Sequence, residues 1–205
     1  GSCQLIPSDA VEKAVDRDLG VEFYRHAPKV IGVDVAREGG DKSVITLRQG
    51  LVCHWQEEHR GLDLMTLAGI VAQHIDTEKP DAVFIDKTGI GAGVYDRLRQ
   101  LNYMEVFGID FGSSATEPEK YINKRTEIWC LMRDWVVDGG SIPPIEDLKI
   151  DLTGPEYGFT GDKMQIFLEK KKDMKKRGLA SPDNGDSLAL TFSMPVFPAQ
   201  QNRQQ

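Results

Sequence analysis

Residues 30–35 read Val-Ile-Gly-Val-Asp-Val, a short run of mostly β-branched residues between polar neighbours. This pattern predicts a buried central strand that begins at Lys29. An acid that closes such a run is costly to bury unless it is paired or bound to a metal ion. Asp34 is therefore a candidate functional residue.

The residues after this strand predict an antiparallel meander. Gly39-Gly40-Asp41 has the composition of a turn and precedes an apolar strand over 43–47. Gln49-Gly50 indicates a second turn, which leads into a third strand over 51–56. We expect these three strands to pair in sequence order.

Two strand–helix units follow the meander. Asp63 is the expected N-cap of a helix whose apolar residues recur every three or four positions until Lys79-Pro80. Residues 82–86 predict a strand, and a glycine-rich turn opens a second helix before a fifth strand over 105–109. This order predicts parallel pairing with right-handed crossovers. The expected fold is α/β, with a five-stranded mixed sheet (three antiparallel strands plus two parallel) flanked by helices.

The C-terminal part is expected to be less regular. A long helix over 123–138 ends at Gly139-Gly140, and Glu127 falls beside its apolar face, where we expect it at the surface. Residues 141–168 have the Pro and Gly spacing of β-hairpins, and a last short helix is expected over 183–192. The apolar face of the long helix comprises Ile128, Leu131, Met132, Trp135 and Val136.

The expected domain covers residues 29–194. Gly1-Ser2 resembles a remnant of cloning, and residues 1–28 are interpreted as a tag remnant and linker with one short helix near 10–19. The Gln- and Pro-rich residues 195–205 are expected to be disordered. We expect the tail after Phe192 to contribute to docking on a partner.

Composition limits the class of protein. Of 205 residues, 40% are apolar and 28% charged, which is typical of a globular domain, and no apolar run approaches the length of a membrane span. Three cysteines without a CxxC pair argue against a disulfide scaffold or a zinc site and fit a reducing cytoplasm. With 25 basic and 32 acidic residues, the net charge is −7, so any nucleic-acid contact must use a local basic patch.

Two further acids match Asp34 in placement. Asp86 ends the expected fourth strand, and Asp186 lies in the first turn of the last helix. Parallel strands lie about 4.8 Å apart, so aspartates at the same height meet at one point. Crowded carboxylates repel each other, and oxygen ligands favour Mg²⁺ or Mn²⁺ over zinc. Two such ions about 4 Å apart would clamp a phosphodiester.

Each acid also has an ordinary structural interpretation. A single aspartate at a strand end is commonly a turn former or a helix cap, and Asp183 after Pro182 fits an N-cap better than a ligand. The three acids in matching contexts favour the metal site.

Four parts of the chain resemble the large terminase subunit of tailed bacteriophages. Ile31-Gly32-Val33-Asp34-Val35-Ala36, followed by residues 39–43, resembles the first acidic motif of that family. Residues 84–91 (Phe-Ile-Asp-Lys-Thr-Gly-Ile-Gly) resemble the second motif, and residues 176–191 the third. Residues 123–129 are also similar to a segment of these proteins.

This resemblance implies an RNase H-like (RuvC-like) nuclease domain that cuts concatemeric double-stranded viral DNA during genome packaging, in the cytoplasm of the host cell. It implies that Asp34, Asp86 and Asp186 are the catalytic, metal-binding acids of a two-metal hydrolysis and that Asp183 is an auxiliary ligand. The implied partners are an upstream ATPase motor domain, the small terminase subunit and the portal. The isolated domain is expected to be monomeric and to make no membrane contact.

The motor activity itself is not expected in this chain. No GxxxxGK[ST] motif occurs, and residues 39–43 place Asp41 where a phosphate-binding loop needs glycine. We expect no ATP hydrolysis.

The densest positive charge lies just before the third motif. Residues 170–177 hold six basic residues in eight, and in a net-acidic chain this placement favours phosphate contacts over a merely solvated helix face. Lys124 and Arg125 extend the patch. No base-reading motif is visible, so cleavage is expected to depend little on sequence. The expected DNA-binding residues are Lys170, Lys171, Lys172, Lys175, Lys176, Arg177 and Lys163.

Three other functions remain open at this stage. Another RNase H-like enzyme, of the Holliday-junction resolvase or integrase type, would prefer branched DNA or transfer strands. Half of an actin-like or sugar-kinase-like ATPase would bind ATP. A non-catalytic DNA-binding or docking module would use the acids only as caps.

Overall fold

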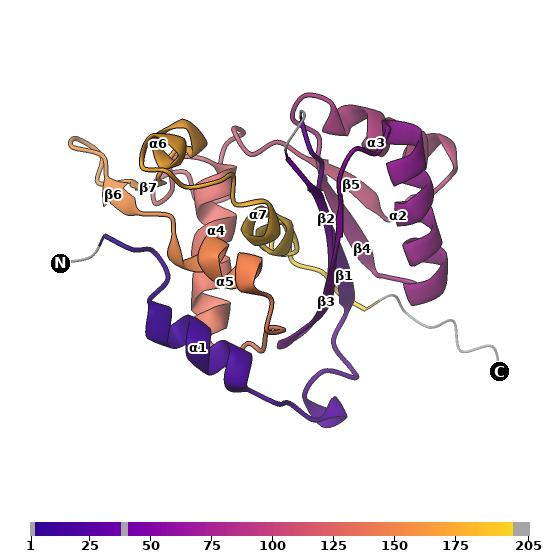
Figure 1. Cartoon of the computed structure of the whole chain (residues 1–205), viewed down its shortest axis with the longest axis horizontal. Coiled ribbons are helices and arrows are strands. Elements are labelled where there is room, and N and C mark those ends of the chain that lie inside the picture. The colour runs from indigo at the N-terminus through magenta and orange to yellow at the C-terminus, as the bar shows by residue number, and fades with distance from the viewer. Residues whose placement is uncertain (1–2, 38–40, 199–205) are drawn as a thin grey trace.

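The computed structural model describes residues 3–37 and 41–198, and it contains the expected mixed sheet (Figure 1). Five strands lie in the order β3-β2-β1-β4-β5, with β1, β2 and β3 antiparallel and with β4 and β5 parallel to β1. The predicted fold class is confirmed, although the turn expected at Gly39-Gly40 falls outside the described residues. The strands are β1 (Lys29–Asp34), β2 (Ser43–Gln49), β3 (Val52–His59), β4 (Ala82–Asp86) and β5 (Val106–Ile109).

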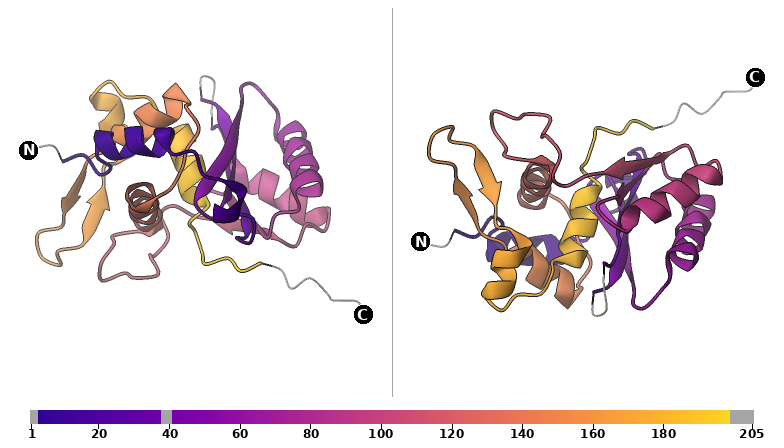
Figure 2. Two further views of the ribbon diagram at one scale, coloured as in Figure 1. Left: turned by 90° about the horizontal axis from the view of Figure 1, so that it is seen from below. Right: turned by 90° about the horizontal axis from the view of Figure 1, so that it is seen from above.

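Helices cover the two faces of the sheet unequally. The α2 and α3 helices lie side by side on one face, whereas α7 lies directly on the other face with α4, α5 and α1 outside it (Figures 1 and 2). Two hydrophobic clusters result, one on each side of the sheet. The helices are α1 (Ser8–Asp16), α2 (Leu64–Glu78), α3 (Gly91–Gln100), α4 (Lys124–Asp138), α5 (Glu146–Thr153), α6 (Lys171–Lys176) and α7 (Asp183–Leu190), with a short 3₁₀ helix at Val21–Phe23.

Local signals place the helix ends. The Asp63 carboxylate accepts the Thr66 N–H at 2.8 Å, as its expected capping role requires, and Lys79 adopts the left-handed conformation where α2 ends. Asn123 caps α4 in the same way through the N–H of Thr126. Gly139, with φ of 135°, ends α4 as expected.

The α7 helix sits on β1 because Gly32 has no side chain. A Cβ on Gly32 would lie 2.1 Å from the carbonyl oxygen of Ser187, so no other residue fits without moving the helix. The backbone of α7 therefore approaches the central strand closely at Gly32, two residues before Asp34 at the carboxyl end of β1.

The N-terminal region differs from the sequence expectation. The short helix expected near 10–19 is present as α1, but the segment interpreted as a linker is packed: Ala10, Val11 and Ala14 of α1 are buried against α4 and α5. These small apolar residues lie among charged ones, so the sequence indicated the helix but not that it packs against the rest of the domain. This part of the expected linker packs into the core.

Three expectations for the C-terminal half are wrong in detail. Residues 146–153 form α5 rather than hairpin, with Leu148 and Leu152 buried one turn apart; the hairpin is confined to β6 (Tyr157–Phe159) and β7 (Ile166–Leu168). Leu131 is 40% exposed although it was assigned to the buried face of α4. Glu127 is buried rather than exposed, because its carboxylate accepts the N–H groups of residues 116 and 117 and pairs with Lys124.

Among the residues described, no helix combines the length and apolarity that crossing a membrane requires.

Candidate metal centre

The carboxyl ends of β1 and β4 carry two buried aspartates. Parallel pairing sets Val33 beside Ile85, so Asp34 and Asp86, the next residues, lie at the same edge of the sheet. Only 4% of Asp34 and 3% of Asp86 is exposed. The Thr88 N–H donates to Asp86 Oδ1 at 2.9 Å and fixes that side chain in the turn before α3.

The α7 helix brings two more acids to this edge. Asp183 and Asp186 lie one turn apart on the helix, and both are buried. Asp183 is the first residue of α7 and Pro182 is in the capping position, so the alternative of a capping Asp183 is wrong. The Lys42 N–H approaches Asp183 Oδ2 at 3.5 Å.

A lysine ammonium lies among these carboxylates. Lys171 Nζ is 2.7 Å from Asp186 Oδ2 and contacts the face of Phe111. Burial lowers the pKa of Lys171, but Asp186 and Asp34 outweigh that effect and raise the pKa to about 12. The residue expected to contact DNA is thus a permanent positive charge inside the acidic cluster.

The second oxygen of Asp186 faces α4. The Trp129 indole N–H donates to Asp186 Oδ1 at 2.9 Å, and Arg125 Nε lies 3.7 Å from the same oxygen. Asp186 is fully buried, which alone would raise its pKa, but Lys171 and Arg125 together hold that pKa below its usual value. Asp186 is therefore ionised.

The pKa values of the other three acids in the cluster are raised, in contrast to the lowered pKa of Asp186. Burial raises the pKa of Asp34 well above its ordinary value, and the neighbouring Asp186, Asp183 and Asp86 carboxylates raise it further, against the opposing pull of Lys171. Burial also raises the pKa of Asp86 and of Asp183. The cluster contains four carboxyl groups, and the Lys171 ammonium can neutralise the charge of only one of them.

The donor set fits a hard divalent cation. Four carboxylates interact around one ammonium, and such oxygen donors suit Mg²⁺ or Mn²⁺. In the described part of the chain, however, no three acidic, His or Cys side chains converge closely enough to hold one ion. Lys171 pairs with Asp186 Oδ2 at 2.7 Å, so an ammonium already neutralises part of the cluster.

A small pocket opens beside the cluster. It has a volume of about 130 Å³ and is lined by Asp34, Asp183 and Lys171, with Arg37 and Lys175 among its other residues. A larger cavity of about 530 Å³ lies at the other end of β1, between α4 and the residues after α7, and none of the four clustered aspartates lines it. Of the four clustered aspartates, Asp34 and Asp183 line the small pocket.

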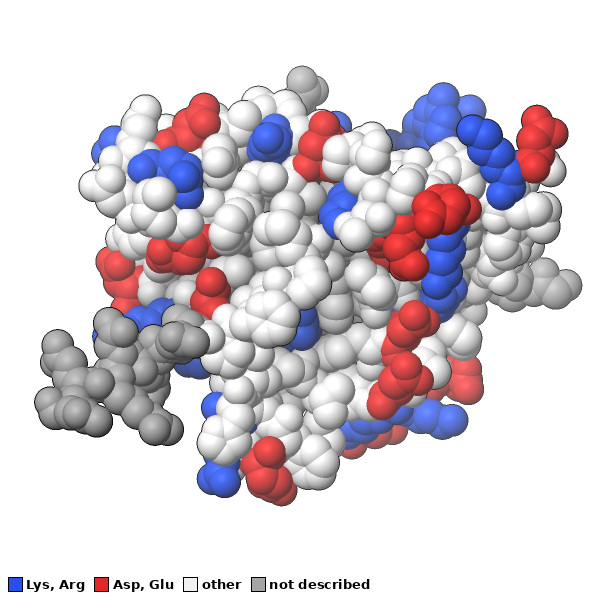
Figure 3. Space-filling view, turned by 180° about the vertical axis from the view of Figure 1, so that it is seen from behind, with Lys and Arg blue, Asp and Glu red and all other residues white. Residues whose placement is uncertain are grey.

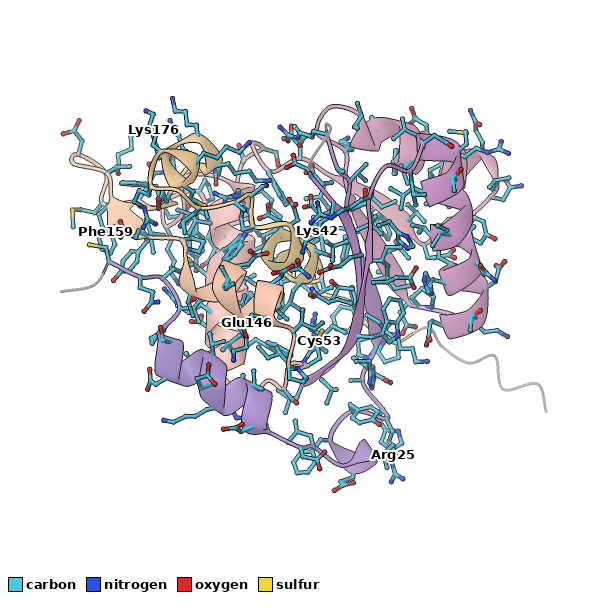
Figure 4. The ribbon with its side chains drawn as sticks, viewed as in Figure 1. Arg25, Lys42, Cys53, Glu146, Phe159 and Lys176 are labelled. Atoms are coloured by element: carbon cyan, nitrogen blue, oxygen red, sulfur yellow. The ribbon has the colours of Figure 1, made fainter. Side chains whose placement is uncertain are left out.

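The remaining basic residues divide into two groups. Lys170, Lys172, Lys175 and Lys176 are exposed at or near α6, as is Lys163 on the hairpin loop, and blue side chains gather over this corner of the molecule (upper right in Figure 3). Figure 4 shows Lys176 projecting from α6. Arg177 instead makes a bidentate pair with Glu169, both bonds at 2.8 Å.

Sequence reasoning missed two features of the centre. Lys171 was one lysine in a run of six basic residues, and nothing in that run distinguishes the member that turns inward. Asp151 of α5 was not singled out; its carboxylate accepts the Gly185 N–H at 3.1 Å, and burial raises its pKa to about 7.

Comparison with known proteins supports the sequence resemblance at the level of structure. No protein-family model and no curated protein sequence matches the chain. A variant of the large terminase subunit of bacteriophage Sf6, solved with calcium, superposes with a TM-score of 0.78 at 18% identity, covering 93% of this chain and 99% of that one. The fold is that of a large terminase nuclease.

Two other terminase nucleases agree. The large terminase nuclease of thermophilic phage G20c with bound magnesium has a TM-score of 0.57 at 18% identity, covering 89% of this chain and 96% of that one. The nuclease domain from Thermus phage P74-26 has a TM-score of 0.60 at 16% identity and covers 94% of both chains. At these identities the likeness establishes the terminase nuclease fold.

Proposed function

We propose that this protein is a metal-dependent endonuclease that cleaves double-stranded DNA during viral genome packaging. The observation that carries the proposal is the burial of Asp34, Asp86, Asp183 and Asp186 at one edge of a terminase nuclease fold, where they interact electrostatically with one another and with the Lys171 ammonium. A structural role does not explain why a fold would bury four acids beside one lysine.

The cofactor is proposed to be Mg²⁺ or Mn²⁺, with Asp34, Asp86 and Asp186 as ligands and Asp183 as an auxiliary one. Structures of the same fold are described with manganese and with magnesium. A pair of bound ions would activate a water and stabilise the leaving oxygen of the phosphodiester. Because Lys171 pairs with Asp186 at 2.7 Å, we infer that the ammonium keeps the acids together until a cation takes its place.

The exposed lysines near α6 are proposed to hold the DNA backbone. Lys172, Lys175 and Lys176 stand at the corner that also carries Lys171, so phosphates bound there would lie next to the acidic cluster. Contacts of this kind carry no sequence information, which fits cleavage with little sequence specificity. Because Arg177 is held by Glu169, its contribution to DNA binding is expected to be smaller.

The packaging role and its partners rest on the terminase fold alone. A motor domain, the small terminase subunit and the portal are the proposed partners. The rival RNase H-like functions share the acidic centre and differ in the form of DNA that they cut.

Substrate form distinguishes these functions. The purified protein, supplied with Mn²⁺ or Mg²⁺, is incubated with linear duplex, a four-way junction of the same sequence, and a duplex with a recessed end. We expect cleavage of linear duplex at a rate at least equal to that of the junction, without strand transfer. Selective junction cleavage or joined strands would instead favour a resolvase or an integrase, and an inert protein that binds no Mn²⁺ would favour a docking module.

A further inference from the structure

The α7 helix is held to the sheet by a stripe of polar side chains. Asn184, Ser187 and Thr191 recur three and four residues apart and face β1, β2 and β3. The Ser187 hydroxyl lies 2.7 Å from Thr46 Oγ1 and donates to the Val44 carbonyl at 2.9 Å. The acids Asp183 and Asp186 each precede a member of this stripe, so the rotation that docks the stripe also aims the acids.

Gln56 of β3 contacts Asn184, the first member of this stripe. Its Nε2 donates to the backbone carbonyl of Asn184 and to Thr46 Oγ1, both at 2.9 Å. Its Oε1 accepts the Asn184 side-chain amide, also at 2.9 Å. One amide thus binds both the backbone and the side chain of Asn184, the residue that follows Asp183.

An ion cluster around the buried Lys42 supports the same contact from the side. Glu58 Oε1 also accepts the Asn184 amide at 2.9 Å, and Lys42 Nζ bridges Glu58 at 2.9 Å and Asp147 of α5 at 2.7 Å. Figure 4 shows Lys42 between α7 and the sheet. The first turn of α7 is therefore fixed from β3, α5 and the segment after β1.

We propose that Gln56 is a positioning residue of the metal centre: its amide sets the rotation of the first turn of α7 and thereby aims the Asp183 and Asp186 carboxylates at Asp34. Its effect on metal binding rests on the proposed function, but its effect on the position of α7 does not. Polar residues that orient metal ligands commonly contribute about 10-fold to 100-fold in affinity or activity.

The first test measures Mn²⁺ binding by calorimetry on the DNA-free protein with Gln56→Met, which keeps the length of the side chain and removes its amide. We expect Mn²⁺ affinity to fall by about 10-fold and kcat for DNA cleavage to fall with it, while KM for DNA is unchanged. Gln49→Met is the matched control. Gln49 is a buried glutamine of β2 whose amide donates to the Ala27 carbonyl at 3.1 Å, at the far end of the sheet from the acids.

The second test does not require a metal or catalysis. The Trp129 indole N–H donates to Asp186 Oδ1, so its NMR resonance, assigned with Trp129→Phe, reports the position of that carboxylate. We expect Gln56→Met to shift this resonance and Gln49→Met to leave it in place. Gln56→Glu, which keeps an acceptor for the Asn184 amide and removes the hydrogen bonds that the Gln56 amide donates, should give a smaller shift and covers the case in which Gln56→Met does not fold.

The outcomes separate the two proposals. A Trp129 resonance unchanged in both Gln56→Met and Gln56→Glu would overturn the positioning role, as would equal losses of Mn²⁺ affinity in Gln56→Met and Gln49→Met. If the wild-type protein binds no Mn²⁺, the proposed function fails, and the indole resonance still decides whether Gln56 positions α7.

Discussion

At the residue scale, the central feature is one lysine among four aspartates. Lys171 is the partner of Asp186 Oδ2, and it also lowers the pKa of the buried Asp34. A divalent ion carries twice the charge of the Lys171 ammonium and can be coordinated directly by the carboxylate oxygens. Lysine and metal are therefore expected to compete for one place.

Replacement of Lys171 tests this competition. Lys171→Met is expected to bind Mn²⁺ about 10-fold more tightly, because the ion no longer displaces an ammonium. Without metal the variant should melt at a lower temperature than wild type, since Asp186 loses its closest charge partner, and Mn²⁺ should restore the loss. Calorimetry and thermal denaturation measure both effects. Lys172→Met, an exposed neighbour, is the control, and equal Mn²⁺ affinity in wild type and Lys171→Met would contradict competition.

Replacement of Asp34, a proposed metal ligand, is expected to stabilise the metal-free protein. Burial raises its pKa in the folded protein, so the folded state keeps a proton that the unfolded chain has already released. The contribution of Asp34 to the free energy of unfolding is therefore greatest at low pH. It is lost as the pH rises from the pKa of an ordinary aspartate through the raised pKa of Asp34 in the folded protein. In EDTA at pH 8, Asp34→Asn should therefore melt above wild type by about 3 °C, which corresponds to roughly 1 kcal/mol in a domain of this size.

Thermal denaturation in EDTA between pH 4 and pH 8 measures this difference. It should shrink toward pH 4, where wild-type Asp34 is itself neutral. A variant that melts at or below wild type at pH 8 would show that Asp34 is stabilised as an anion in the metal-free protein.

At the element scale, the position of α7 depends on the glycine beneath it. Gly32→Ala would place a Cβ 2.1 Å from the Ser187 carbonyl, so α7 must move away from β1 or strain the strand. We expect a loss of about 3 kcal/mol in the free energy of unfolding together with weaker Mn²⁺ binding.

Urea denaturation and calorimetry measure the two effects of Gly32→Ala. Gly69→Ala is the matched control, because no atom lies within 4 Å of a Cβ at this position in the middle of α2. It should leave stability equal or raise it by up to about 1 kcal/mol. Normal stability of Gly32→Ala would mean that α7 is not held as closely as described.

Sequence reasoning succeeded for elements whose signal is local. The run that ends at Asp34 and the Asp63 cap each carry their own pattern, so the sheet and α2 follow from them. The α5 helix was missed because two prolines precede it and only two of its apolar residues, Leu148 and Leu152, are buried. Gln56 looks like an ordinary polar residue on an outer strand, and only the fold shows that it contacts α7.

At the scale of the whole molecule, the two faces of the sheet differ in the residues that they bury. The α2 and α3 side is packed by apolar residues, whereas the α7 side combines an apolar core with the polar stripe and the acidic centre. The acids come from three elements, so the centre exists only when β1, β4 and α7 are assembled. A sequence can indicate each acid, but their convergence and the inward turn of Lys171 are properties of the assembled fold.

Cleavage of supercoiled plasmid by the purified protein tests the central claim most directly. Reactions contain Mg²⁺ or Mn²⁺, with EDTA as the metal-free reference, and compare wild type with Asp86→Asn and with Asp96→Asn, a control on the exposed side of α3. We predict nicked and linear products with wild type and Asp96→Asn, and intact plasmid with Asp86→Asn or EDTA. Cleavage by Asp86→Asn at the wild-type rate, or cleavage that persists in EDTA, would contradict a metal-dependent nuclease centred on these aspartates.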